Sequence, residues 1–307
     1  MKEIIFKYLK RLNINGLAAF KNGPAIFLDQ APDDSDSRWD GSQYGRIIYG
    51  LNLKDDSERK VSGTMEIAIA YLFNNQGYKN LLEAKKILKK AFEGVFLTDE
   101  DTTISLVWRK SESFQEAIEG QMDVEVCGSV LTFDAYAFPK HSYLPLDAVG
   151  SLAKHIDENW NVTVINNTEL DEIWKPDDEE VVVYTRLDSM QPGTFPSTYA
   201  CTWFTNNIKV HVISGSDVNA DQFVMNLLQD LQERERFVMN DGSPFFVNQL
   251  AYSTKLDPLK DGQVTVRGQY GKLRDVRRKQ WQKRKTKQKQ CQKLLILWMN
   301  MQKIHRC

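Results

Sequence analysis

Carboxylates gather in one loop near the start of the chain, and closely spaced carboxylates are the ligands that calcium prefers. Residues 31–41 contain Asp33, Asp34, Asp36 and Asp40. A calcium loop that began at Asp36 would place Asp40 and Gly41 correctly. It would also place Arg38 where a ligand is needed and Ile47 where the bidentate glutamate belongs. We therefore expect no calcium site, and a solvated loop that contacts a partner is the favoured interpretation.

The other residues that could do chemistry are scattered. The four histidines show no ligand spacing, and the run Asp99–Asp101 is explained most simply as a loop between a helix and a strand. The sequence contains no Walker loop, no GxGxxG turn, no GxSxG elbow and no HExxH helix. The hypothesis from the residues is a protein with no catalytic site, no metal and no cofactor, and hence not an enzyme.

Size and composition predict a soluble chain with two domains. The 307 residues are 42% hydrophobic and 26% charged, which is ordinary for globular proteins. No segment approaches the roughly 20 apolar residues that span a bilayer, and the first residues do not form a signal-peptide core. The four cysteines form no CxxC pair, which suits reduced thiols. We expect a cytosolic protein without membrane partners.

The net charge of -1 hides a strong asymmetry between the body and the end of the chain. Residues 274–307 carry 12 Lys and Arg against the single acid Asp275, so the preceding residues are strongly acidic. The basic segment is interpreted as a solvated extension, because it self-repels and has little apolar surface to bury. Two alternatives stay open: phosphate contacts to nucleic acid, or packing of the apolar run 294–299 on a partner or membrane. Candidate nucleic-acid contacts are Arg277, Arg278, Lys279, Lys283, Arg284 and Lys285.

Periodicity predicts an α+β fold with two tandem units, residues 1–143 and 144–273, before a basic extension, residues 274–307. Each unit is expected to be a helix, three strands, a helix and two strands, giving a mostly antiparallel sheet with helices on one face. For the first unit we predict helices at 2–12 and 79–92 and strands at 24–29, 46–53, 64–72, 103–108 and 122–138. For the second we predict helices at 145–160 and 217–236 and strands at 181–184, 199–204, 208–213, 245–252 and 263–270. The order of elements repeats although the residues do not.

Several segments give this pattern a family resemblance. The strand 130–139, the run Trp174-Lys175-Pro176-Asp177 and the strand 182–186 resemble structural tail proteins of prophages from Gram-positive bacteria. Residues 24–32 and 58–64 are similar to the same group. Within it, the order of elements best resembles the tail terminator, also called the tail-completion protein. The resemblance covers roughly residues 20–272.

The resemblance implies a ring at the collar, which caps the tail tube and joins it to the head connector. It implies self-association, contact with the tube protein and with sheath or connector proteins, and DNA that passes an acidic lumen without specific binding. The location would be the virion tail or a tail-like particle, assembled in the host bacterial cytoplasm. The alternative function is a nucleic-acid-binding accessory protein that uses the basic segment. Candidate partner contacts lie in loops 31–41, 54–60 and 188–197: Asp33, Asp34, Asp36, Arg38, Trp39, Asp40, Lys54, Asp55, Asp56, Glu58, Arg59, Lys60, Met190 and Phe195.

Overall fold

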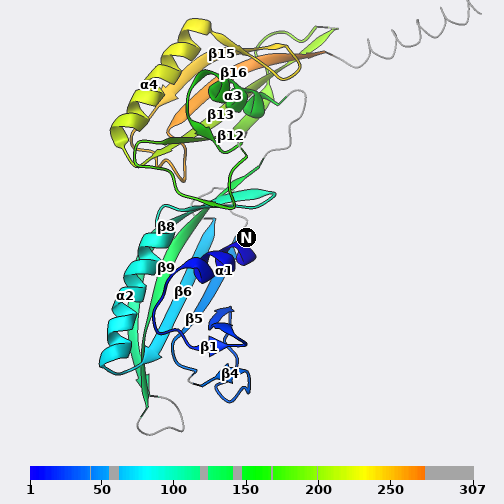
Figure 1. Ribbon diagram of the computed structural model, residues 1–307. Helices are drawn as coiled ribbons and strands as arrows, with labels where there is room; N and C mark the ends of the chain where they lie inside the picture. The colour runs from blue at the N-terminus through cyan, green and yellow to red at the C-terminus, as the bar shows by residue number, and fades with distance from the viewer. Residues whose placement is uncertain are drawn as a thin grey trace, which may run out of the picture.

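The structure is a computed structural model, and it describes residues 1–41, 43–54, 62–117, 124–140, 147–166, 169–198 and 200–273. Figure 1 shows two lobes, each a sheet with helices packed on one face, joined end to end. The fold is α+β with mixed sheets and four helices in the described residues. No helix in the described part is long and apolar enough to cross a membrane.

The first lobe is built on a seven-stranded sheet of order β11-β7-β8-β9-β6-β5-β3. All neighbouring strands are antiparallel except β3 and β5, which are parallel. A small sheet of order β2-β1-β4 lies beside it. The elements are α1 (Lys2–Arg11), β1 (Ala19–Phe20), β2 (Gly23–Pro24), β3 (Ile26–Leu28), β4 (Trp39–Asp40), β5 (Arg46–Leu53), β6 (Gly63–Leu72), α2 (Asn75–Phe92), β7 (Phe96–Thr98), β8 (Thr102–Ala117) and β9 (Glu125–Pro139).

The second lobe is built on a six-stranded sheet of order β10-β12-β13-β16-β15-β14. Here β10 and β12 form the parallel pair. The strand β11 (Ile173–Trp174) leaves this lobe and pairs with β7 of the first. The remaining elements are α3 (Ala148–Asn159), β10 (Thr163–Val164), β12 (Val181–Pro192), β13 (Cys201–Ser214), α4 (Asp217–Arg234), β14 (Arg236–Val238), β15 (Pro244–Tyr252) and β16 (Val264–Leu273).

The two sheets follow one order of elements. From the parallel pair outward, the first runs β3-β5-β6-β9-β8-β7 and the second runs β10-β12-β13-β16-β15-β14. A helix precedes the first strand of each, and a second helix follows the third strand. Within the described residues, the first sheet has a seventh strand, β11, which comes from the second half of the chain, and the second sheet has six strands.

The local sequence explains the helix boundaries. Asn74 caps α2, because its side chain accepts a hydrogen bond from the backbone N–H of Gly77 at 2.7 Å. The helix ends before Gly94, whose φ of 72° is the left-handed conformation that glycine adopts without strain. Ser216 caps α4 in the same way. The caps set where each helix begins, and the apolar side chains of each helix pack on its sheet.

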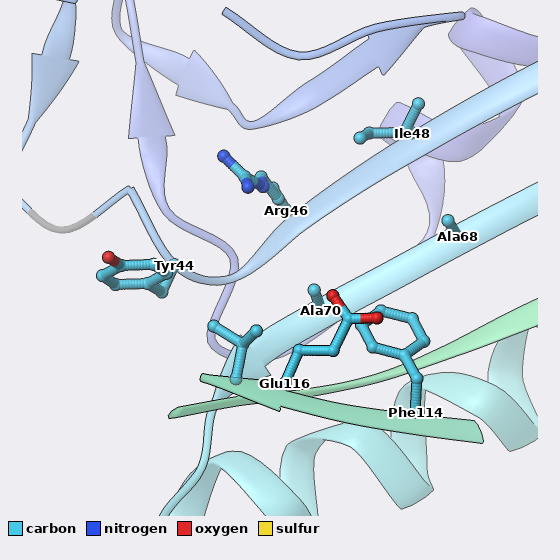
Figure 2. A pocket seen from close by; sticks show the side chains of 8 residues that line it. Tyr44, Arg46, Ile48, Ala68, Ala70, Phe114 and Glu116 are labelled. Carbon is cyan, nitrogen blue, oxygen red and sulfur yellow. The ribbon is translucent and has the colours of Figure 1, made fainter. Parts of the chain in front are cut away.

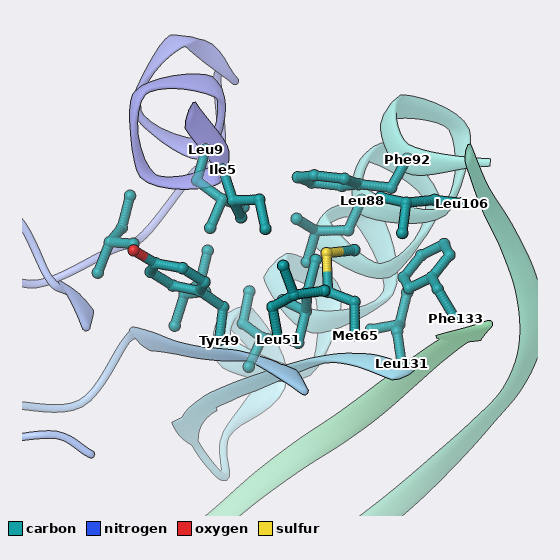
Figure 3. Packing of buried hydrophobic residues seen from close by; sticks show 14 of the residues in the cluster. Ile5, Leu9, Tyr49, Leu51, Met65, Leu88, Phe92, Leu106, Leu131 and Phe133 are labelled. Carbon is teal, nitrogen blue, oxygen red and sulfur yellow. The ribbon is translucent and has the colours of Figure 1, made fainter. Parts of the chain in front are cut away.

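The core of the first lobe lies between its sheet and both helices. Figure 3 shows Ile5 and Leu9 of α1 and Leu88 and Phe92 of α2 pointing toward Met65 and the other inward side chains of the strands. Strand β6 alternates strictly, with buried side chains at every second position. The second core is built in the same way, with α3 and α4 over β12, β13 and β16.

Several predicted elements need correction. The strands expected at 199–204 and 208–213 are one continuous strand, β13, because the polar residues Thr205, Asn206 and Asn207 remain paired in the ladder. The strand β11, Ile173–Trp174, was not predicted. The short strands β7, β10 and β14 were not predicted, since two or three residues are too few to show a period. Strand β11 lies in the second predicted unit and pairs with β7 of the first sheet.

The core predicts a contrast between two leucines of α2. Leu88 is fully buried, whereas Leu82 is 45% exposed. Leu88→Ala should lower the free energy of unfolding by about 2–5 kcal/mol, because it leaves a cavity under the helix. Leu82→Ala on the same helix should change it by less than about 0.5 kcal/mol. Urea denaturation followed by circular dichroism measures both, and equal losses would contradict this packing.

Candidate interaction surfaces

The acidic loop, residues 31–41, is held by two ion pairs. The Arg38 guanidinium donates Nε hydrogen bonds to both carboxylate oxygens of Asp36, at 2.8 and 3.0 Å. These hydrogen bonds lower the pKa of Asp36 to about 2. Arg46 Nη1 on β5 lies 2.6 Å from Asp34 Oδ1 and fixes the loop to the sheet. The loop is therefore a shaped acidic surface.

Trp39 anchors the loop internally. Its ring packs edge-on against Phe20 at 5.0 Å and Phe27 at 5.5 Å, and its Nε1 donates to the Asp33 carbonyl at 3.0 Å. Trp39 and Asp40 form β4, which pairs with β1 on one side and is an edge strand of the small sheet on the other. Trp39 was predicted in a loop but lies in β4, because its backbone pairs with Phe20 of β1.

The other predicted contacts fall in three places. Lys54 closes the β5–β6 hairpin, where its N–H donates to the Ser62 carbonyl at 2.6 Å. Met190 was expected in a loop but lies in β12 opposite Asn206, because the β12–β13 ladder extends to Pro192. Phe195 is in a loop as predicted, with its ring 4.9 Å from that of Trp203. Outside the described residues lie Asp55, Asp56, Glu58, Arg59, Lys60, Arg277, Arg278, Lys279, Lys283, Arg284 and Lys285.

The face of the first sheet that points away from the helices carries an apolar patch that the sequence analysis missed. Figure 2 shows Ala70 close to Glu116 and Phe114, with Ile48 and Ala68 farther along their strands and Arg46 and Tyr44 toward the other end. They line a shallow pocket of about 230 Å³. We call Arg46, Ile48, Ala68 and Ala70 the outer patch. The signal in the sequence was that β5 and β6 are apolar at positions of both parities, where a solvated face would be polar.

The corresponding face of the second sheet is polar and cationic. Lys209 Nζ donates to Thr265 Oγ1 at 2.9 Å, and Arg186 Nε donates to His211 Nε2 at 3.1 Å. His211 Nδ1 lies 2.6 Å from the Pro258 carbonyl, which can only accept. The proton of a neutral His211 is therefore on Nδ1. The same face also carries an aromatic group, in which Trp203 contacts Phe246 and Phe195.

The two lobes meet through an aromatic joint. Phe96 of β7 stacks on Trp174 of β11 with ring centroids 4.5 Å apart, and Phe138 of β9 packs edge-on against Tyr184 at 5.1 Å. The Tyr184 hydroxyl donates to the Pro139 carbonyl at 3.0 Å. Val182, Tyr184 and Ile165 of the second lobe are buried here against Phe96, Tyr136 and Phe138 of the first. The cluster is a small hydrophobic core shared by both lobes.

One histidine–carboxylate pair has the composition of an acid–base dyad. His155 Nε2 lies 3.0 Å from Asp230 Oδ2, which joins α3 to α4. Arg234 also binds Asp230 at 2.6 Å, and the imidazole is enclosed by the rings of Trp160 and Phe237. These contacts assign the pair to helix packing. In the described part of the chain, no group of three or more His, Cys, Asp or Glu side chains is arranged to hold a metal ion.

Asp36 and Arg38 predict a measurable titration. Because the folded pKa of Asp36 is lowered, the pair favours the folded state above about pH 4, and this contribution disappears as the pH falls through about 2. Arg38→Met should return the pKa of Asp36 toward about 4. Arg38→Lys keeps the charge but loses the forked hydrogen bonds and should give an intermediate value. Carboxyl NMR titration measures all three proteins, and an unchanged pKa in Arg38→Met would contradict the pairing.

The joint predicts that Trp174 holds the lobes together. Trp174→Ala removes the stack on Phe96 and should weaken the contact by about 2–3 kcal/mol, so that the lobes separate part of the time. Small-angle X-ray scattering should then show a larger radius of gyration. Trp174→Phe retains an aromatic ring and should scatter like the unaltered protein. Identical scattering from Trp174→Ala would show that the stack does not set the arrangement.

Comparison with family models, curated proteins and solved structures finds no match to this chain.

Proposed function

We propose that the chain is a structural protein of a phage or phage-like tail, which caps the end of the tail tube as a ring at the collar and joins it to the head connector. The observation that carries the proposal is the shared element order of the two sheets, each with helices on one face only. We infer that the lobes are tandem copies of one tail-terminator-like unit, residues 1–143 and 144–273. The resemblance of residues 20–272 to such proteins supports the same function.

The distribution of side chains suits an assembly role. A ring needs lateral surfaces of complementary character that meet by rotation. The first lobe offers the acidic loop and the outer patch, and the second offers a cationic outer face and an exposed aromatic group. The partners proposed are other copies of the chain, the tube protein, and sheath or connector proteins, with DNA passing through the lumen without specific binding. The site of action is the virion tail or tail-like particle, assembled in the bacterial cytoplasm.

The chemistry of the described residues gives an enzymatic proposal little support. The one histidine–carboxylate pair is engaged in packing α3 against α4. The pocket at the outer patch is lined mainly by apolar side chains. We therefore propose a non-enzymatic protein without a cofactor.

Electron microscopy of tail tubes tests the proposed function. Purified protein added to tubes should appear as density on one tube end and should stop further tube growth. The truncated chain 1–273 should behave like the full chain, because both cores are complete before residue 274. Tubes that grow on unchanged, with bare ends, would reject the proposal.

A DNA-binding experiment distinguishes the proposed tail function from the alternative, in which the basic segment binds nucleic acid. If residues 274–307 bind nucleic acid, the full chain should bind DNA with an affinity that falls steeply from low to physiological salt, and the chain 1–273 should not bind. Filter binding of both proteins at two salt concentrations measures this. Salt-sensitive binding that is lost on truncation, in a protein that ignores tubes, would favour the nucleic-acid-binding accessory function.

A further inference from the structure

We propose that the joint between the two lobes is repeated between copies of the chain: the outer patch and acidic loop of one copy dock on the β14 edge and aromatic outer face of another copy's second lobe. The inference deepens the proposed ring, on which it rests, by naming the two surfaces that meet. It follows from applying the shared order of elements to the aromatic joint described above.

The first step is the correspondence between strands. In the first lobe Ile47 of β5 is opposite both Ile26 of β3 and Ile69 of β6. In the second lobe Val183 of β12 is opposite both Val164 of β10 and Val212 of β13. All six side chains are buried under the helices. Ile47 and Val183 are therefore equivalent positions.

The next step is to compare the opposite faces. The residues before and after the equivalent positions face the other side of each sheet. Arg46 therefore corresponds to Val182, and Ile48 corresponds to Tyr184. Ala70, the partner of Arg46, corresponds to Ile213, the partner of Val182. In the second lobe Val182 and Tyr184 are fully buried in the joint, and Ile213 packs against it. In the first lobe the equivalent residues form the outer patch, whose side chains are only half-buried around a pocket. The outer patch is thus the first lobe's version of a surface that the second lobe uses to bind its neighbour.

The surface that would cover the outer patch is found in the same way. In the joint, Phe96 of β7 is opposite Ser105 of β8, which is opposite Tyr136 of β9, so the three residues form one row across the sheet. The equivalent row in the second lobe runs from Arg236 through Phe246 to Gln269. Phe246 in this row contacts Trp203, which in turn contacts Phe195. Phe195 remains 47% exposed, so an apolar partner would bury it.

The pairing of edge strands and the charge of Arg236 both favour contact between the acidic loop and β14. In the joint, the connection between β10 and β12 supplies β11, which pairs with the edge strand β7. The equivalent connection in the first lobe, between β3 and β5, is the acidic loop with its edge strand β4. The equivalent acceptor is β14, an edge strand of the second sheet in the described part of the chain. It begins at the exposed Arg236, whose charge is opposite to that of the acidic loop, although Glu235 directly precedes it.

Two variants that damage opposite sides of the contact provide the test. Ile48→Asp places a charge in the outer patch, and Arg236→Glu reverses the charge at the β14 edge. Each should weaken self-association at least tenfold in sedimentation velocity over a concentration series, without and with tail tubes. Val218→Asp is the matched control, because Val218 is a 74% exposed apolar residue of α4, away from both surfaces. Circular dichroism checks folding, and Ala68→Glu replaces Ile48→Asp if that variant does not fold.

Mixing the variants gives the sharpest result. A contact between unlike surfaces leaves each variant with one intact side, so Ile48→Asp and Arg236→Glu mixed at equal concentration should form a dimer that grows no further. A protein that stays monomeric in every condition, or variants that associate normally, would overturn the inference. Tube capping that is unaffected by both variants would reject this contact and leave the proposed function standing. Association through these surfaces without capping would reject the function and leave the contact.

Discussion

The stacking of Trp174 on Phe96 is the contact on which the arrangement of the molecule depends. It lies where the chain has left the first sheet, formed α3 and β10, and returned to pair β11 with β7. Two hydrogen bonds also hold this segment to the first lobe. The Thr98 N–H donates to the Glu172 carbonyl at 2.9 Å, and Lys175 Nζ donates to the Glu93 carbonyl at 2.7 Å. Without this segment, Phe96 and Phe138 would present aromatic surface to water. The lobes therefore form one body with a shared core, even though each has its own sheet and helices.

The same joint explains why the two outer faces differ. In the second lobe the positions nearest the joint are large and buried, and those farther along the sheet carry Arg186, Lys209 and Thr265. In the first lobe the equivalent positions hold Ile48, Ala68 and Ala70, which are small or aliphatic and half-buried. The two lobes share an order of elements and bury apolar side chains under their helices, while the residues that face outward differ. Outer surfaces that differ in this way can recognise different neighbours.

Much of the framework could be predicted from the sequence, because long periodic segments carry a strong signal. The alternation of β6 and the apolar stripe of α2 identify a strand and a helix within a few residues of their bounds. The three-residue strands β7 and β14 could not be found, since three residues are too few to show a period, although each pairs with the next strand along the chain. The continuity of β13 through Asn206 was missed for the opposite reason, because polar residues in a paired strand look like a loop. The outer patch was missed because apolar residues on both faces of a strand suggest full burial.

The position of β11 in the sequence also constrains the order in which the protein can fold during synthesis. The first sheet has all its other strands once Pro139 has left the ribosome, but β7 acquires its outer neighbour only when Trp174 follows. In that interval the nascent first lobe has an open edge strand and an uncovered Phe96 and Phe138, which is the kind of surface that pairs with other chains. Neighbouring ribosomes on one messenger would hold such intermediates close together. A translation rate that is slow across residues 140–174 would lengthen this exposure, and a fast one would shorten it.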